Sequence, residues 1–225
     1  MRCRGEWIPA VAAPVLVAAS LLWWRRIEPV FVGYHLGLCL VWPWLAARRS
    51  TASWREHLLS LGLGRRGLVP GTALGVVFAA APLAAFAVLP EIFPTPDRLR
   101  LVLDGWHLDP HHPGPALLFL ALINGPAEEM FWRGWLPLRL GTGRITLIAL
   151  AVLFTSYHAV TIGALAPHAA GRSLMLASVL LAAIFWTWTR QRWGTLWPAL
   201  LTHSGATLGY LAVCRIILQG ANASS

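Results

Sequence analysis

The chain has 225 residues, of which 57% are hydrophobic and only 12% are charged, a balance that excludes an ordinary water-soluble domain and predicts a protein embedded in a bilayer. The formal net charge of +9 rests on arginine alone, because the chain contains no lysine. These arginines flank apolar segments and are not interleaved with aromatic residues, which favours anionic membrane lipid as a partner and argues against nucleic acid.

The apolar residues fall into blocks of about twenty, the length of helix that crosses roughly 30 Å of hydrocarbon. In chain order the predicted spans cover residues 7–24, 29–47, 68–89, 115–140, 145–163, 173–189 and 195–218. The first block ends at Trp23, Trp24, Arg25 and Arg26, which is typical of an interfacial stop and not of a cleaved signal peptide. We therefore expect an all-α fold, a polytopic transmembrane helix bundle of about seven spans, in one integral membrane domain over residues 1–225.

Between the third and fourth spans, residues 90–114 are polar and rich in proline. We expect them to form an exposed loop. The loop contains acidic residues and three histidines, His107, His111 and His112, but their spacing fits no tight metal-ligand pattern. The loop therefore predicts no metal site.

The positions of the arginines predict an orientation. If the N-terminus is cytoplasmic, the cytoplasmic segments carry Arg2, Arg4, Arg48, Arg49, Arg55, Arg65, Arg66, Arg139, Arg144, Arg190 and Arg192. The opposite face then carries Arg25, Arg26, Arg98, Arg100 and Arg172. Because cytoplasmic loops are enriched in basic residues, we expect a multi-pass protein of the cell's inner (plasma) membrane with its N-terminus in the cytoplasm.

Two of the acidic residues, Glu128 and Glu129, lie deep inside the fourth predicted span. A carboxylate at membrane depth costs several kcal/mol, so the pair needs buried partners, water or a function. Glu129 and Arg133 are four residues apart on one helical face, and their ion pair alone would only fix helix packing. Glu128 points about 100° further round the helix and has no such partner in its own segment, which favours a functional site.

Histidines in two other spans are candidate partners. His158 lies in the middle of the fifth span and His203 lies about two turns into the seventh, and at about 1.5 Å per residue both reach the depth of the two glutamates. A carboxylate and an imidazole that share a water are suited to hydrolysis of an amide bond. Because no bulk water reaches this depth, we expect the polar residues to line a cavity open to the cytoplasmic face.

These residues carry a family resemblance. Residues 128–133, Glu-Glu-Met-Phe-Trp-Arg, match the motif E-E-x-x-x-R; residues 154–158 match F-x-x-x-H; and His203 opens a third motif, H-x-x-x-N. In order and approximate spacing, the C-terminal half of the chain, with its core at about residues 115–218, resembles the CPBP intramembrane proteases. That group includes the CAAX prenyl endopeptidase of the Rce type and the bacterial Abi-type immunity proteins.

The resemblance implies a glutamic intramembrane endopeptidase without a cofactor. By position, Glu128 would activate the water, Glu129 and Arg133 would support it, His158 would complete the water site, and His203 would stabilise the oxyanion. This chain departs from the family in having Thr207 where the third motif has asparagine. A threonine hydroxyl can donate one hydrogen bond but lacks the reach of the amide, so Thr207 stands either as a weaker donor or as a packing residue.

Other mechanisms remain open. One glutamate and two histidines form a permissible zinc ligand set, although H-E-x-x-H is absent and Arg133 would oppose a cation. A serine protease of the rhomboid type would use Ser173, which follows Gly171 and Arg172. However, Ser173 begins the sixth predicted span, where serine is a preferred N-cap residue.

Two possible functions without catalysis also remain open. Buried glutamate and histidine also serve proton-coupled carriers, and a catalytically weakened member of the family would act as a scaffold or immunity protein. For a membrane peptide or protein substrate, maturation of a peptide, trimming of a C-terminal sorting tail and bacteriocin immunity are all compatible roles.

Overall fold

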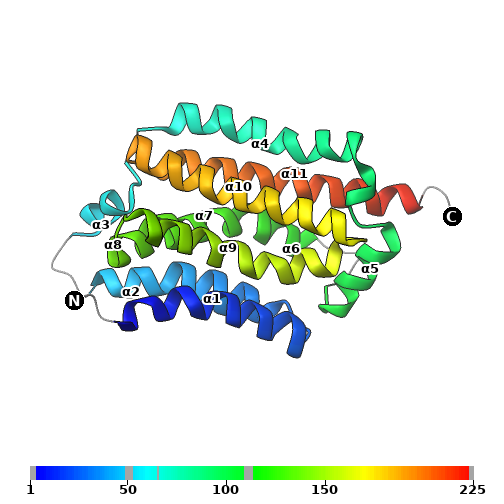
Figure 1. Cartoon of the computed structure of the whole chain (residues 1–225), viewed down its shortest axis with the longest axis horizontal. Coiled ribbons are helices and arrows are strands. Elements are labelled where there is room, and N and C mark those ends of the chain that lie inside the picture. Colours follow the sequence, from blue (N-terminus) through cyan, green and yellow to red (C-terminus); the bar gives the residue numbers. More distant parts are fainter. Residues whose placement is uncertain (1–3, 49–52, 65, 109–113, 223–225) are drawn as a thin grey trace.

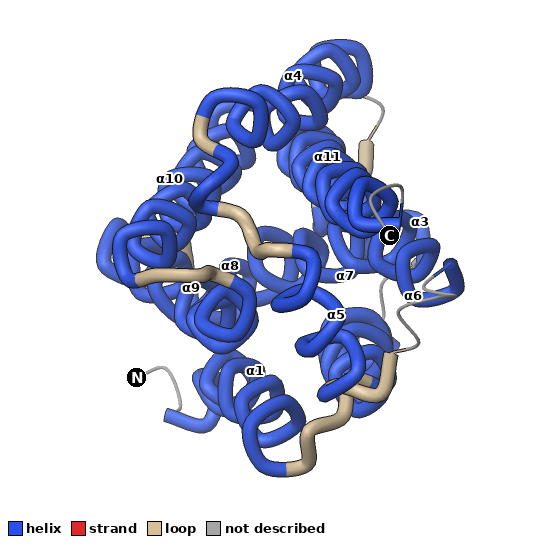
Figure 2. Tube along the Cα trace, turned by 90° about the vertical axis from the view of Figure 1, so that its right-hand side faces the viewer, coloured by secondary structure: helices blue, strands red, loops and turns tan. Residues whose placement is uncertain are grey.

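A computed structural model describes residues 4–48, 53–64, 66–108 and 114–222 of the chain. Within these residues every regular element is a helix, and the long helices run roughly parallel to one another along the long axis of the molecule (Figure 1). Viewed down that axis, they form a ring (Figure 2). The protein is therefore an all-α helical membrane bundle, as the composition predicts.

The N-terminal part consists of η1 (Arg4–Trp7), α1 (Ile8–Ala18), η2 (Ala19–Trp23), η3 (Val30–Val41), α2 (Trp42–Arg48), α3 (Trp54–Leu61) and α4 (Leu68–Val88). Two short helices follow, η4 (Pro90–Ile92) and α5 (Pro96–Gly105). The C-terminal part consists of α6 (Gly114–Phe119), η5 (Leu120–Asn124), α7 (Gly125–Glu129), η6 (Met130–Trp135), α8 (Leu136–Leu140), α9 (Arg144–Leu165), α10 (Ala169–Trp193) and α11 (Trp197–Asn222). We call the end of the bundle that carries α3 and α8 the α3 end, and the opposite end the α5 end (Figure 1).

Each of the seven predicted spans falls on a helical run. Among the described residues, four helices are long and apolar enough to cross a membrane, namely α4, α9, α10 and most of α11. The first two runs, Ile8–Trp23 and Val30–Ala46, are apolar but shorter. The remaining run, 114–140, contains Glu128, Glu129 and Arg133 and is helical throughout.

The prediction of an exposed loop over residues 90–114 is wrong for most of that stretch, because η4 and α5 occupy it. α5 begins at a strong local signal: the Thr95 hydroxyl caps the helix by accepting from the Arg98 amide, and Pro96 occupies the first turn. Leu99 and Val102 of α5 are buried. His111 and His112 lie outside the described residues.

Two π-helical segments, η5 and η6, flank the short helix α7 within the run 114–140. Each ends two residues before a proline, Pro126 or Pro137. A proline has no N–H to donate and its ring crowds the carbonyl one turn earlier, which accounts for the wider turns. The prolines therefore set the local geometry on both sides of Glu128 and Glu129.

The helix that carries His203 is held by close contact with α4. α11 packs along α4 over most of its length, and a Cβ atom added to Gly205 would collide with the backbone carbonyl of Gly75. Small residues allow two helix backbones to approach in this way, and van der Waals contact then drives their association in lipid. α11 thus presents the turn that starts at His203 from a fixed position.

Candidate active site

Glu128 and Glu129 come from α7, and their side chains are 1% and 0% exposed. Glu129 has two close partners, because Nη1 of Arg133 and Nδ1 of His203 both donate to its Oε1 atom at 2.9 Å. The ion pair with Arg133 spans one helical turn, as the sequence predicts. The contact with His203 joins α7 to α11, so Glu129 fixes both a cation and an imidazole.

Aromatic rings hold these two partners in place. The guanidinium carbon of Arg133 lies 4.2 Å from the centre of the Phe154 ring and 5.2 Å from that of Trp186. The His203 ring stacks on Trp186, with ring centres 4.3 Å apart and planes 13° apart. A planar cation and a planar imidazole between ring faces have little rotational freedom, so the geometry around Glu129 is rigid.

The two oxygens of Glu128 have different surroundings. Oε1 accepts a hydrogen bond from Nε2 of His35 at 3.2 Å. Oε2 is buried and has no hydrogen-bond partner among the described residues, while Nε2 of His203 lies 3.6 Å away. A buried carboxylate oxygen without a partner is costly and calls for an explanation such as a catalytic role or a bound water.

Sequence reasoning missed His35. It lies in η3, more than ninety residues before Glu128, and outside the three motifs. Its Nδ1 faces the carbonyl oxygen of Val30 at 3.1 Å, and its Nε2 also faces Oδ1 of Asn124 at 2.6 Å. A signal was present, since His35 is a third histidine inside a predicted span and such residues are functional candidates by default.

His158 lies on α9 and lines the same cavity as Glu128. Its Nδ1 donates to the carbonyl oxygen of Phe154 at 3.0 Å, which leaves a lone pair on Nε2 for a hydrogen bond from water. Thr207 also lines this cavity, one helical turn after His203. All six residues predicted from the sequence therefore lie in or directly behind one site.

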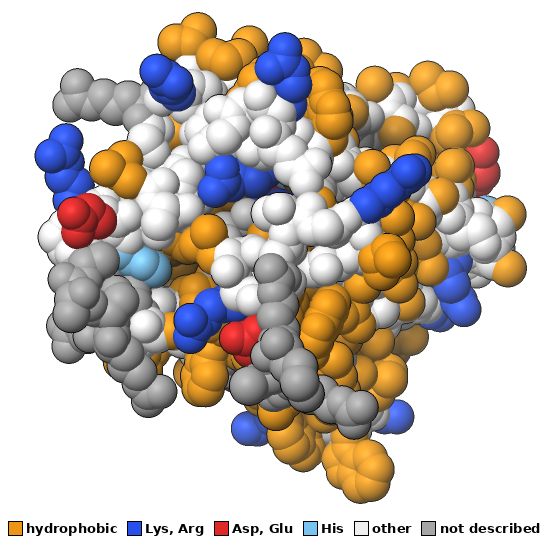
Figure 3. Space-filling view, turned by 60° about the vertical axis from the view of Figure 1, so that its left-hand side comes forward, with side chains coloured by type: hydrophobic (Ala, Val, Ile, Leu, Met, Phe, Trp, Pro, Cys, Tyr) orange, Lys and Arg blue, Asp and Glu red, His pale blue; other side chains and the backbone are white. Residues whose placement is uncertain are grey.

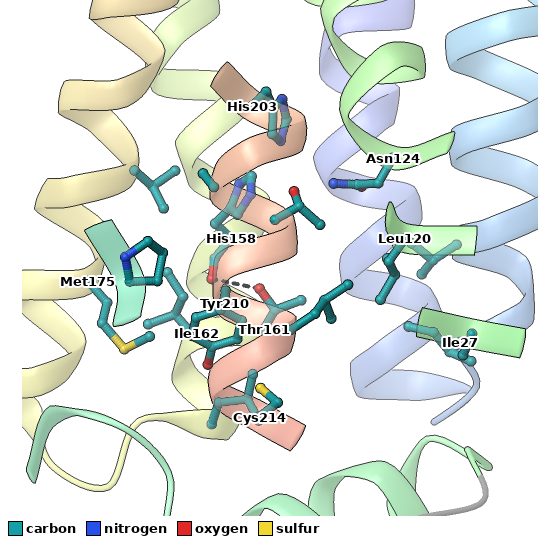
Figure 4. Close-up of a pocket in the computed structure, with 18 of the residues that line it drawn as sticks. Ile27, Leu120, Asn124, His158, Thr161, Ile162, Met175, His203, Tyr210 and Cys214 are labelled. Carbon is teal, nitrogen blue, oxygen red and sulfur yellow. Dashed lines mark hydrogen bonds between the residues drawn. The ribbon is translucent and has the colours of Figure 1, made fainter. Parts of the chain in front are cut away.

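The site lies at the inner end of a cavity of about 1190 Å³ with a mostly apolar lining. From His203 the cavity follows α11 past Tyr210 and Cys214 to Leu218, about 22 Å at 1.5 Å per residue (Figure 4). The other walls come from α4, α9 and α10, from the N-terminal segments α1, η2 and η3, and from η5, and α5 contributes Leu103. The cavity therefore runs from the site to the α5 end.

If the arginine-rich α3 end is cytoplasmic, as the sequence predicts, this direction is opposite to the expected cavity open to the cytoplasmic face. Toward the α3 end the site is closed by tightly packed side chains, Phe131, Trp132, Leu136 and Leu196, each with 1% or less of its surface exposed. Trp132 also donates from Nε1 to the hydroxyl of Tyr34 at 2.9 Å. A separate cavity of about 400 Å³ is lined by Trp132, Arg133 and residues of α8, α9 and α10 near the α3 end, but not by Glu128, His158 or His203.

The structure weighs against the serine alternative. Ser173 is exposed and is not among the residues that line the cavity. The prediction that Ser173 caps its helix is wrong, because α10 begins four residues earlier and His168 is the cap, accepting from the Gly171 amide at 2.9 Å. Within the described residues, no group of three or more His, Cys, Asp or Glu side chains is placed to hold a metal ion.

Residues 110–209 match the family model for type II CAAX prenyl endopeptidases of the Rce1-like type. Over these residues the chain is similar to the Rce1-like protease family. The match includes Glu128, Glu129 and Arg133 on their shared run and both His158 and His203, but it does not extend to His35. No curated protein and no solved structure matches the chain. Most of the site described above thus lies in the part of the chain that is similar to CAAX-protease-like membrane proteins.

Proposed function

We propose that the protein is an intramembrane endopeptidase in which Glu128 activates a water molecule to hydrolyse a peptide bond. The observation that carries this proposal is Oε2 of Glu128, an unpartnered buried acceptor at the end of a cavity large enough for a peptide segment. A water between this oxygen and Nε2 of His158 would satisfy both acceptors, since water has two protons to donate.

The reaction follows from this placement. Oε2 takes one proton from the water while the water oxygen forms a bond to the carbonyl carbon of the substrate. The carbonyl oxygen thereby becomes an oxyanion. Nε2 of His203 lies 3.6 Å from Oε2 and faces the same space; in the imidazolium form, with Nδ1–H held by Glu129, its Nε2–H can donate to that oxyanion. When the carbon–nitrogen bond breaks, Glu128 returns the proton to the leaving amine.

Glu129 and Arg133 act behind this centre. The carboxylate of Glu129 accepts from Nδ1 of His203, which keeps a proton on that nitrogen and orients the ring. Arg133 balances the charge of Glu129, which would otherwise be an unpaired ion in an apolar core. Thr207 is placed to add one hydroxyl donor from the next turn of α11.

The cavity suggests how a substrate arrives. The segments predicted from the sequence to be cytoplasmic carry eleven of the 18 arginines. Figure 3, which brings the α3 end forward, shows arginine side chains spread over that end. By the positive-inside rule the α3 end faces the cytoplasm, which leaves the N-terminus inside. Since the cavity leads to the opposite end, we infer that the substrate is a membrane-associated peptide segment that enters from the non-cytoplasmic side. Trimming of membrane tails and maturation of exported peptides fit this direction.

The test is cleavage of a membrane-peptide library by the purified full chain in liposomes, followed by mass spectrometry. Glu128→Gln has the shape of the natural side chain but cannot take a proton, so we expect at least a thousandfold loss of turnover. Glu91→Gln, an exposed glutamate in η4, is the matched control and should cleave like the natural protein. Activity should also survive a zinc chelator.

Three outcomes would change the proposed function or its mechanism. Cleavage by Glu128→Gln at the natural rate would overturn the proposed base. Loss of all cleavage with chelator, restored by zinc, would replace it with a metal mechanism. If folded natural protein and Glu128→Gln both fail to cleave any member of the library, a scaffold or immunity protein becomes the better description.

A further inference from the structure

Asn124 has a side-chain donor that no contact among the described residues uses. It lies one turn before Glu128 on the same helical run, and its Oδ1 accepts a hydrogen bond from Nε2 of His35 at 2.6 Å. His35 fixes which way the amide faces, because its Nε2 also donates to Oε1 of Glu128, a carboxylate oxygen that only accepts. With the proton on Nε2 directed at these two side chains, the amide oxygen of Asn124 faces the ring.

The NH₂ group of Asn124 therefore faces away from His35. In Figure 4 the amide nitrogen points across the cavity toward α11, the helix of His203. Asn124 lines this cavity together with Glu128, His203 and Thr207. Within the described part of the chain, the NH₂ group has no hydrogen-bond partner, so two N–H donors are directed into the cavity beside the base.

The close approach of two helices brings this donor near the reacting groups. Gly125 follows Asn124, and a Cβ atom added to it would lie 2.7 Å from Oγ of Ser204, closer than real Cβ atoms come. Ser204 follows His203 on α11. The backbones that carry Asn124 and His203 are therefore in contact at adjacent residues, and the amide lies beside the turn from His203 to Thr207.

We propose that Asn124 supplies the carboxamide donor of this site, in the place left by Thr207 in the third motif, and that it donates to the oxyanion together with His203. The proposal rests on the peptidase function proposed above. His35 acts as a positioning residue, because one ring holds both Oε1 of Glu128 and Oδ1 of Asn124. The base and the donor are thereby fixed to each other through a single side chain from η3.

The experiment compares Asn124→Leu, which has a similar volume and no donor, with the natural protein on a peptide that the library identifies. We expect kcat to fall about 100- to 1,000-fold, the usual loss of an oxyanion donor, with KM changed less than about threefold. Thr72→Val is the matched control, since Thr72 is exposed on α4 and its hydroxyl bonds only its own helix; its kcat should be unchanged.

The decisive measurement tests whether an amide placed on α11 restores the activity that Asn124→Leu loses. Adding Thr207→Asn to Asn124→Leu returns an amide to the cavity without restoring any contact to His35, and we expect it to recover kcat at least tenfold. A role of Asn124 in holding His35 alone predicts no rescue, and predicts that Asn124→Leu has no further effect in a His35→Phe background. Either result would overturn the donor role.

Two further measurements distinguish the loss of a donor from misfolding and from failure of the proposed peptidase function. If Asn124→Leu does not fold, Asn124→Asp keeps the volume and the oxygen that faces His35 but has no N–H, and the same loss of kcat is expected. An active Asn124→Asp with natural kcat contradicts the proposal. If Glu128→Gln also cleaves normally, the failure lies with the proposed function instead.

Discussion

The two ends of the bundle differ sharply on either side of Glu128. Toward the α3 end, Phe131, Trp132, Leu136 and Leu196 are almost fully buried, and the cavity of about 400 Å³ on that side is not lined by Glu128. Toward the α5 end, the same ring of helices encloses a cavity of about 1190 Å³. A carboxylate at membrane depth thus has a dry, rigid support on one side and an opening on the other. The difference suggests that the α3 end provides stability and the α5 end provides access, which is the division of roles that an intramembrane hydrolase needs.

Removing Arg133, the cation on the packed side of the site, should have the largest effect on stability. In Arg133→Met the carboxylate of Glu129 stays buried without its ion-pair partner, and breaking such a pair costs about 3–5 kcal/mol. We expect the free energy of unfolding in detergent, measured by denaturant titration, to fall by about this amount. In the double variant Arg133→Met/Glu129→Gln much of the loss should return, because no unpaired charge remains. Equal stability of all three proteins would mean that the pair is not buried.

A matched pair of truncations compares the two ends directly. Trp132→Ala leaves a void in close packing and removes the donor to Tyr34, so a loss of about 3 kcal/mol is expected. Leu211→Ala only enlarges the existing cavity, and a loss below about 1 kcal/mol is expected. The same unfolding titration measures both. A similar loss for the two variants would argue that the α5 end is packed in solution and that the cavity is closed.

Filling the cavity should reduce activity and leave the fold intact. Ala206 lines the cavity one turn from the site, so Ala206→Phe places a ring in the path of a substrate. We expect kcat/KM for the identified peptide to fall about 10- to 100-fold, equivalent to about 1.4–2.8 kcal/mol, with the unfolding midpoint nearly unchanged. Ala80→Phe adds the same ring to an exposed position on α4 and serves as the control. Unchanged cleavage by Ala206→Phe would point to a different entry route.

How far the sequence could predict this site depends on where each contact comes from. Glu129 and Arg133 are four residues apart on one helix, so helical geometry alone pairs them. His158 and His203 lie in separate spans, but polar residues in apolar helices cost enough to be conspicuous. Asn124 is uncharged and lies near a helix kink, where it carries no comparable signal. Its contact with His35 joins η5 to η3, and no local pattern encodes how those helices pack.

The direction of the cavity and the helix α5 were missed for different reasons. The α3 end is closed because Trp132 and Leu196, which come from different helices, are both buried there, and that depends on tertiary packing. α5 did have a local signal in Thr95 and Pro96, but the polar, proline-rich composition of residues 90–114 outweighed it. The amphipathic α5, with Leu99 buried beneath the α5 end, shows that polar composition does not exclude a packed helix.

Two natural cysteines can be used to compare access to the closely packed interior with access to the cavity. The difference in their labelling rates is the smallest effect that we expect. Cys39 is fully buried, whereas Cys214 is partly exposed and lines the cavity. In a Cys3→Ser background, we expect a small maleimide to label Cys214 about tenfold faster than Cys39, measured by mass spectrometry of peptides, because access limits the reaction of a buried thiol. Applied to intact cells, a membrane-impermeant maleimide should also label Cys214 if the cavity opens to the non-cytoplasmic side. Labelling of Cys214 only after the membrane is opened would reverse the orientation of the bundle, and with it the side from which the substrate arrives, while leaving the chemistry at Glu128 untouched.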